Sequence, residues 1–224
     1  MLICGIDEAG RGPIIGPMVM AGVLVDEEGS ESLKSIGVKD SKLLTIGRMR
    51  KLFDKIKGTA IRHKIVVIQP SEIDAALESD SLNLNWLEAH KSAEIINFLK
   101  PEKAIIDSPS NNIVNYKRYL VKLLDNKGID VSVEHKADLN HVECGAASIL
   151  AKVTREDEIE KIKKKIGDNF GSGYPSDPLT KSFLEKNLDR HPEIFRKSWM
   201  TYKRAAGSRG QKRIDDFGSG LSPE

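Results

Sequence analysis

The chain has 224 residues, and its 35 lysines and arginines against 33 aspartates and glutamates give a formal net charge of +2. This near-balance excludes a histone-like basic coat and an acidic solvating chain. The excess charge is confined to residues 201–224, which hold five basic and three acidic side chains, so the remainder of the chain is neutral.

Length and cysteine content narrow the class of protein further. A chain of this length forms one large domain, or one domain with a small appendage, at about 150 residues per domain. Cys4 and Cys144 are its two cysteines, and their spacing suits neither a zinc site nor a disulfide framework. No apolar run approaches the roughly 18 residues of a membrane span, and the N-terminus does not resemble a signal peptide. We therefore expect a cytoplasmic, monomeric protein with no membrane partner.

Short apolar runs bounded by charges, glycine or proline predict five strands in the first part of the chain. In chain order they are Leu2–Ile6, Met18–Val25, Ile61–Ile68, Ala104–Ile106 and Val131–Val133. Apolar residues at helical spacing predict helices around 86–96 and 113–123, with Gly128 placed to end the second. Strands mixed with helices are typical of an α/β sheet domain.

After about residue 140 the pattern becomes helical, starting with an apolar stripe from Val142 and interrupted at Gly171–Pro178. The Gly/Ser/Pro-rich end of the chain predicts a flexible tail. We expect three parts, which are a sheet with its central helices (1–140), a remaining fold helix with a helical C-terminal extension (141–204), and the tail (205–224).

Acidic residues follow three of the predicted strands. Asp7 and Glu8 come directly after the first strand, Asp107 after the fourth, and Asp138 shortly after the fifth. Carboxylates at the ends of buried strands are costly unless they are paired, hydrogen-bonded or bound to a metal. Several together raise one another's pKa, and a divalent cation removes that cost. Hard cations such as Mg²⁺ take oxygen ligands, and two of them about 4 Å apart can clamp both oxygens of a phosphoryl displacement.

Each of these acids also has an ordinary structural interpretation. An aspartate after a strand is commonly a helix N-cap or a turn former, and Asp138 before a helix fits that role. The adjacent charges of Asp7 and Glu8, between an apolar strand and Gly10, have no obvious capping purpose. Spacing alone leaves the metal site and the structural interpretation open.

Five motifs resemble, in order, those of type 2 ribonuclease H of the archaeal branch, and the match runs from residue 3 to about residue 204. The motifs are Cys4–Pro13 (CGIDEAGRGP), Asp40–Leu43 (DSKL), Ala104–Pro109 (AIIDSP), His135–Asp138 (HKAD) with Ala146–Val153 (AASILAKV), and Gly171–Pro178 (GSGYPSDP). One such motif is moderate evidence, and five in order are strong evidence.

The resemblance implies an RNase H-like fold, with a five-stranded mixed sheet flanked by helices and a helical C-terminal extension. It implies a metal-dependent endoribonuclease that hydrolyses the RNA strand of RNA–DNA hybrids and incises 5′ to single ribonucleotides in duplex DNA. A two-metal-ion mechanism with Mg²⁺ or Mn²⁺ would leave a 3′-hydroxyl and a 5′-phosphate. By motif position, the catalytic and metal-binding carboxylates are Asp7, Glu8, Asp107 and Asp138.

The resemblance also implies substrate-binding residues. The loop Gly10, Arg11 and Gly12 would sense the ribose 2′-hydroxyl, Tyr174 would pack on the deoxyribose of the junction nucleotide, and Lys42 would contact backbone phosphates. Without the resemblance, the loop reads as an ordinary glycine-rich turn and the tyrosine as a turn residue that covers the core.

Four further polar residues keep two interpretations each. Lys152 and Arg155, on the helix predicted after residue 142, suit either phosphate contacts or a solvated helix face. His135 and His141 lie near Asp138 and could assist proton transfer, but a histidine beside a turn usually has structural partners.

The tail carries a second resemblance. Gln211, Ile214 and Phe217 recur every three residues, so they would share one face of a 3₁₀ turn, as in the sliding-clamp-binding motif of replication and repair proteins. Gly218 stands where that motif usually has a second aromatic residue. A chance arrangement in a polar tail is the alternative.

Two rival functions remain. A type 3 ribonuclease H shares the fold, and the absence of a hybrid-binding domain ahead of Asp7 argues against it. A non-catalytic nucleic-acid-binding protein or sliding-clamp adaptor is the rival from another class. Its phosphate-binding surface would gain nothing from clustered acids.

Overall fold

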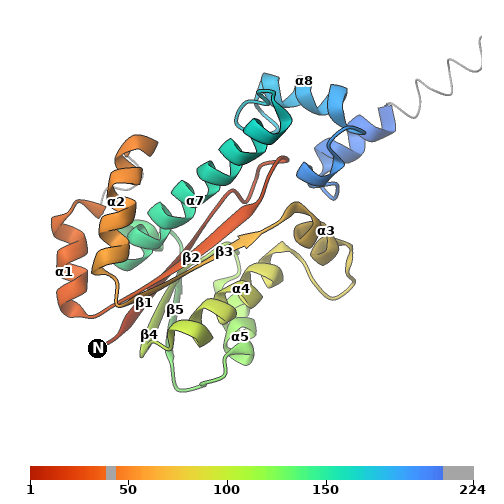
Figure 1. Ribbon diagram of the computed structural model, residues 1–224. Helices are drawn as coiled ribbons and strands as arrows, with labels where there is room; N and C mark the ends of the chain where they lie inside the picture. The colour runs from red at the N-terminus through yellow and green to blue at the C-terminus, as the bar shows by residue number, and fades with distance from the viewer. Residues whose placement is uncertain (39–43, 209–224) are drawn as a thin grey trace, which may run out of the picture.

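The computed structural model describes residues 1–38 and 44–208 (Figure 1). A five-stranded sheet in the order β3-β2-β1-β4-β5 forms its centre. The strands are β1 (Ile3–Ala9), β2 (Met18–Val25), β3 (Arg62–Ile68), β4 (Lys103–Asp107) and β5 (Asp130–Glu134). β1, β2 and β3 pair antiparallel, whereas β4 runs parallel to both β1 and β5. The mixed five-stranded sheet predicted from the sequence is confirmed.

The two faces of the sheet are covered by different helices because side chains alternate along each strand. On β2, Met18, Met20 and Leu24 pack on α4 (Leu84–Leu99) and α5 (Ile113–Leu123). The intervening residues Val19, Ala21, Val23 and Val25 pack toward the opposite face of the sheet. All eight residues of β2 are therefore buried.

The opposite face carries α7 (Val142–Ile166), flanked by α1 (Glu27–Ser35) and α2 (Ile46–Thr59). The start of α7 lies directly against β1, since a Cβ atom at Gly5 would overlap the backbone of Glu143 and Cys144. This close approach places the start of α7 over β1, and the short helix before it, α6 (Ala137–Asn140), packs against α7 and β4.

The C-terminal part forms a separate apolar cluster beyond the sheet. It contains α8 (Pro178–Asn187) and the 3₁₀ helix η2 (Pro192–Ile194), and residues 200–208 are also helical. Phe170, Phe183 and Phe195 pack there against the end of α7. After residue 140 the described residues contain no further strand, only an isolated bridge between Ile15 and Phe195. The helical extension is therefore confirmed.

One helix boundary differs from the prediction. α5 ends at Leu123 rather than near Gly128, because Leu124 already has an extended conformation. The ammonium group of Lys127 donates to the carbonyl oxygens of Val121, Lys122 and Leu124 at 2.5 to 3.0 Å. A lysine therefore satisfies the last carbonyls of this helix, a task that glycine-containing C-caps often perform.

Two further observations complete the fold. The helix α3 (Pro70–Glu78) follows β3 and packs beside α4 and η2. No helix in the described ranges combines the length and apolar character needed to cross a bilayer.

Candidate active site

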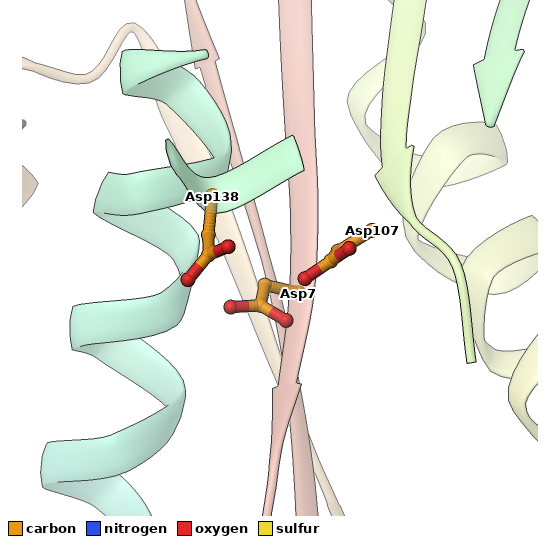
Figure 2. A group of neighbouring side chains, drawn as sticks. All are labelled: Asp7, Asp107 and Asp138. Carbon is orange, nitrogen blue, oxygen red and sulfur yellow. The ribbon is translucent and has the colours of Figure 1, made fainter. Parts of the chain in front are cut away.

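Three aspartates from separate elements meet at one end of the sheet (Figure 2). Asp7 lies on β1, Asp107 ends β4 and Asp138 lies on α6, and one carboxylate oxygen from each falls within 4.8 Å of the others. β1 and β4 are parallel neighbours in which Ile6 is opposite Ile106, so the aspartates that follow are adjacent. The chain leaving β5 then brings α6 over the same edge.

The geometry of this group makes it costly without a cation. The side chains of Asp7 and Asp138 are almost fully buried. Burial raises the pKa of Asp7 well above its ordinary value, and the negative charges of Glu8 and Asp107 raise it further. Clustered carboxylate oxygens are the ligands that hard divalent cations prefer. Because all three side chains offer carboxylate oxygens, the three aspartates fit a site for such a cation.

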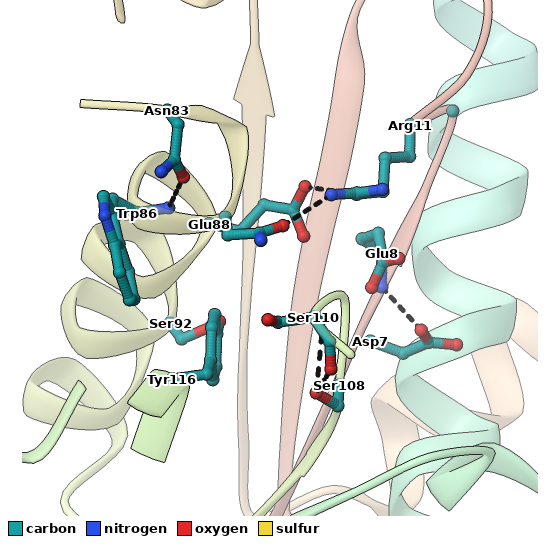
Figure 3. Close-up of polar contacts among 12 residues, drawn as sticks. Asp7, Glu8, Arg11, Asn83, Trp86, Glu88, Ser92, Ser108, Ser110 and Tyr116 are labelled. Carbon is teal, nitrogen blue, oxygen red and sulfur yellow. Dashed lines mark hydrogen bonds and ion pairs between the residues drawn. The ribbon is translucent and has the colours of Figure 1, made fainter. Parts of the chain in front are cut away.

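Glu8 points to the other face of β1 from Asp7. Along this strand Cys4 and Ile6 belong to the α4 side, and Glu8 follows them by the same alternation. It is not a member of the group of three aspartates described above. Its backbone amide nevertheless donates to Oδ1 of Asp7 at 2.7 Å (Figure 3). The structure thus brings three of the four predicted acids into one group and sets the fourth beside it.

Burial also dominates the electrostatics of Glu8. It raises the pKa of Glu8 to about 8, with smaller contributions from the negative charges of Glu88 and Asp107, while the guanidinium of Arg11 acts in the opposite direction. Glu8 therefore lies within electrostatic reach of the aspartate group although it faces α4.

Glu88 on α4 is a residue of this site that the sequence analysis missed (Figure 3). It is fully buried, and its Oε1 atom accepts a hydrogen bond from Nε of Arg11 at 2.7 Å. Its Oε2 atom has no hydrogen-bond partner within the described part of the chain. Burial raises the pKa of Glu88 to about 7, and the charge of Arg11 opposes the rise. The available signal was a charged residue between Leu87 and Ala89, both buried on this helix.

The loop from Gly10 to Gly12 leaves β1 beside these acids. Gly10 has a φ of 79°, and a Cβ atom there would overlap the side chain of Arg155. The side chain of Arg11 is turned toward α4, where Nε donates to Glu88 and Nη2 donates to Oδ1 of Asn85 at 2.7 Å. Two of its nitrogens are therefore committed to the protein rather than directed to a ligand.

A hollow of about 450 Å³ lies next to this loop. Its lining comes from four parts of the chain: Glu8, Ala9, Gly10, Arg11, Gly12, Ile46, Met49, Lys152, Arg155, Glu156 and Tyr174. Tyr174 is 41% exposed, and its ring lies beside Gly12, because a Cβ atom on that glycine would be 3.6 Å from Cε1 of the tyrosine. The structure therefore brings the predicted glycine loop and the predicted tyrosine together around one cavity.

Arg155 is a second residue whose role the sequence left open. It is only 8% exposed, which excludes the solvated helix face as its environment. Its Cζ atom lies 5.6 Å from the centre of the Tyr174 ring. Its Nε and Nη2 atoms are buried and have no hydrogen-bond partner among residues 1–38 and 44–208. Burial lowers the pKa of this guanidinium.

Neither of the two candidate histidines lines this cavity. Nε2 of His141 is 3.0 Å from Oε2 of Glu134, so this histidine has a structural partner, and His135 is exposed. Lys42, predicted to contact phosphates, lies outside the described residues, as do the tail residues Gln211, Ile214 and Phe217.

Comparisons with known proteins give one answer. The family model described as Ribonuclease HII matches residues 4–202. A Ribonuclease HII of Pyrococcus furiosus is 44% identical in an alignment 225 positions long, which covers 97% of this chain and 98% of the relative. The crystal structure of ribonuclease H2 from Pyrococcus horikoshii OT3 has a TM-score of 0.84 at 41% identity, covering 93% of this chain and 98% of that one. The RNase HII in the PCNA:RNase HII complex of Archaeoglobus fulgidus has a TM-score of 0.80 at 40% identity, covering 89% and 95%.

Proposed function

The chain belongs to the ribonuclease HII family, hydrolytic nucleases with ribonuclease H activity on RNA–DNA hybrids, and we propose that it also incises 5′ to single ribonucleotides in duplex DNA. The products would carry a 3′-hydroxyl and a 5′-phosphate. The observation that carries this proposal is the group of Asp7, Asp107 and Asp138, with a cavity lined by Glu8, the glycine loop and Tyr174 next to it.

The four acids are proposed to hold divalent cations. Asp7, Asp107 and Asp138 would do so directly, and Glu8 would join them from the other side of β1. A pair of Mg²⁺ or Mn²⁺ ions bound there would supply the Lewis acidity that favours attack of water on the phosphodiester and departure of the 3′-oxygen. The chain's own contribution is to hold these oxygens in a preformed arrangement at the end of a rigid sheet.

Substrate recognition is proposed for the cavity beside the acids. The backbone of Gly10–Gly12 can approach a sugar closely because glycine adds no side chain, and the 2′-hydroxyl is the group that distinguishes RNA from DNA. The exposed ring of Tyr174 offers a stacking surface for the neighbouring deoxyribose. The buried nitrogens Nε and Nη2 of Arg155 suit a phosphate oxygen, since a guanidinium forms its strongest hydrogen bonds with anions.

Two proposed contacts involve residues outside the described ranges. We propose that Lys42 contacts backbone phosphates and that Gln211, Ile214 and Phe217 bind a sliding clamp. The similar RNase HII of Archaeoglobus fulgidus is known in complex with PCNA, which supports the second proposal. A Phe217→Ala variant should lose binding to the clamp in a pull-down experiment while its nuclease activity is unchanged. Equal binding by the variant and the intact chain would contradict it.

One incubation tests the proposed activity. A DNA duplex with one ribonucleotide, labelled at its 5′ end, is incubated with the protein and Mg²⁺, and the products are sized on a denaturing gel. A single incision 5′ to the ribonucleotide is expected. Binding without incision would instead support the adaptor function. In a parallel incubation with a long RNA–DNA hybrid, cleavage of the hybrid without incision at the single ribonucleotide would limit the activity to the coarser ribonuclease H reaction.

A further inference from the structure

Arg196 is fully buried, and its guanidinium donates hydrogen bonds to the loop at residues 10–16. Its Nη2 atom donates to the carbonyl oxygen of Gly10 at 2.6 Å, Nη1 donates to that of Arg11 at 2.8 Å, and Nε donates to that of Gly16 at 3.1 Å. Three nitrogens of one guanidinium thus contact three carbonyls of one loop, from a residue that lies 180 positions or more away in the sequence.

The same segment supplies a fourth contact to the loop. Nε1 of Trp199 donates to the carbonyl oxygen of Gly12 at 3.3 Å. The Cζ atom of Arg196 lies 5.0 Å from the ring centre of this tryptophan, so the two side chains pack on each other. The carbonyls of residues 10, 11 and 12 are therefore all held by side chains from the C-terminal segment.

This segment is itself anchored on α3. Asp74 accepts hydrogen bonds from the backbone amides of Lys197 and Ser198, both at 2.9 Å, and from the hydroxyl of Ser198 at 2.5 Å. The amide of Arg196 donates to the carbonyl of Ile14 at 2.9 Å. The guanidinium is therefore presented from a fixed backbone rather than from a loose end.

The direction of the carbonyls determines the direction of the amides. In a trans peptide the C=O and the following N–H point in opposite directions. Carbonyls of Gly10 and Arg11 held by Arg196 consequently turn the amides of Arg11 and Gly12 away from it. These residues line the cavity described above, in which the 2′-hydroxyl is proposed to bind.

A buried guanidinium is an expensive way to satisfy carbonyl oxygens, because its charge must leave water. Burial and the nearby charge of Arg155 lower the pKa of Arg196 to about 9. Arginine nevertheless offers what lysine does not, namely several donors in a fixed plane. A role in fixing geometry therefore explains the choice of arginine better than charge alone.

We propose that Arg196, assisted by Trp199, is a positioning residue that fixes the backbone of Gly10–Gly12 for recognition of the ribose 2′-hydroxyl. The inference rests on the proposed function of that loop. It adds that ribose selectivity depends on a side chain of the C-terminal segment that does not touch the substrate.

The test uses the full chain with Arg196→Lys, which keeps the charge but loses the planar donors, and Trp199→Phe, which keeps a ring but loses one donor. For Arg196→Lys, kcat for incision at a single ribonucleotide is expected to fall about 100-fold, which is the loss that a 1 Å misplacement of a reacting group causes. For Trp199→Phe the fall should be smaller. Affinity for an uncleavable all-DNA duplex should stay within twofold. Hydrogen exchange of the amides of residues 10–16 should become faster in both variants.

A matched control separates positioning from general destabilisation. Leu188→Ala creates a cavity in the same C-terminal apolar cluster but removes no hydrogen-bond donor to the loop, because a leucine side chain has none. Each protein is assayed at the same number of degrees below its own unfolding temperature. If this control loses activity as strongly as Arg196→Lys, or if Arg196→Lys incises within twofold of the intact chain, the positioning role is wrong. Should Arg196→Lys fail to fold, Trp199→Phe with normal incision and normal exchange would overturn it as well.

The exchange measurement needs no activity, so it separates this inference from the proposed function. An intact chain that does not incise the ribonucleotide duplex contradicts the proposed function. Unchanged loop exchange in both variants contradicts the positioning role, whatever the activity.

Discussion

Nε of Arg11 lies 2.7 Å from Oε1 of Glu88, and this ion pair joins the glycine loop after β1 to the fully buried face of α4. The arginine side chain is 38% exposed and the glutamate is not exposed at all. Nη2 of Arg11 also donates to Asn85 on the same helix. The loop is therefore bonded to α4 through the Arg11 side chain and to Arg196 through its backbone carbonyls. The motif that the sequence alone presents as an ordinary glycine-rich turn is thus held by two distant elements.

Glu88→Gln tests the α4 contact. The amide oxygen can still accept from the Arg11 guanidinium, but the carboxylate charge is lost, so only the donor of this hydrogen bond remains ionised and the ion pair is gone. We expect kcat at a single ribonucleotide to fall about tenfold, with a much smaller fall for Asn85→Ala, which removes a neutral acceptor. Steady-state kinetics measure both. Equal losses in the two variants would argue against a special role for the buried carboxylate.

Asp107→Asn tests the aspartate group. The side chain of Asp107 accepts a hydrogen bond from the amide of Ala137 at 3.2 Å, and an asparagine oxygen can keep that bond. The fold should therefore survive, while incision falls by at least about 100-fold because a ligand charge is lost. Circular dichroism checks that the variant is folded, and incision assays measure the loss of activity. Near-normal cleavage by a folded variant would remove Asp107 from the site.

The pH dependence of stability tests the electrostatics. Folding raises the pKa of Glu8 from 4.5 to about 8 and also raises that of Asp7, so the folded state holds these protons more tightly than the unfolded state. The two protonated carboxyl groups therefore contribute to the free energy of unfolding in full below about pH 4.5, and this contribution is lost as the pH rises toward 8. In EDTA the unfolding temperature should therefore fall over this range, and Mg²⁺ should reduce the fall by binding the folded carboxylates.

Glu8→Gln provides the control for that experiment. A glutamine cannot titrate, so the decline in EDTA should become shallower while the unfolding temperature at pH 5 changes little. Differential scanning calorimetry of both proteins across pH 5 to 8 decides it. A variant with the same slope as the intact chain would show that Glu8 does not carry the effect.

Tyr174→Ala tests the wall of the cavity. Stacking of an aromatic side chain on a nucleotide contributes about 1–3 kcal/mol, so incision at a single ribonucleotide should fall about tenfold or more. Because Tyr174 is 41% exposed, the free energy of unfolding should change little. Tyr174→Phe keeps the ring and should retain most of the activity. Full activity of the alanine variant at the junction would refute the role.

Much of the fold could be predicted locally. Met18–Val25 was predicted with the bounds that the structure has, because a continuous apolar run reports burial directly. Apolar residues at helical spacing likewise predicted the helix that begins at Ile113. The end of α5 was wrong, since the side chain that caps it, Lys127, carries no recognisable motif. The three aspartates could be placed at one edge because parallel strands end on the same side.

The sequence by itself determined the motif residues, the family and the five strands, because these depend on residue identity and on patterns within a few positions. Only the tertiary structure decided that Glu8 faces α4, that Arg155 is buried, and that Glu88 and Arg196 hold the glycine loop. The physical reason is distance along the chain. A buried charge is explained by the partner that satisfies it, and these partners lie about 75 to 186 residues away, where no local pattern reports them.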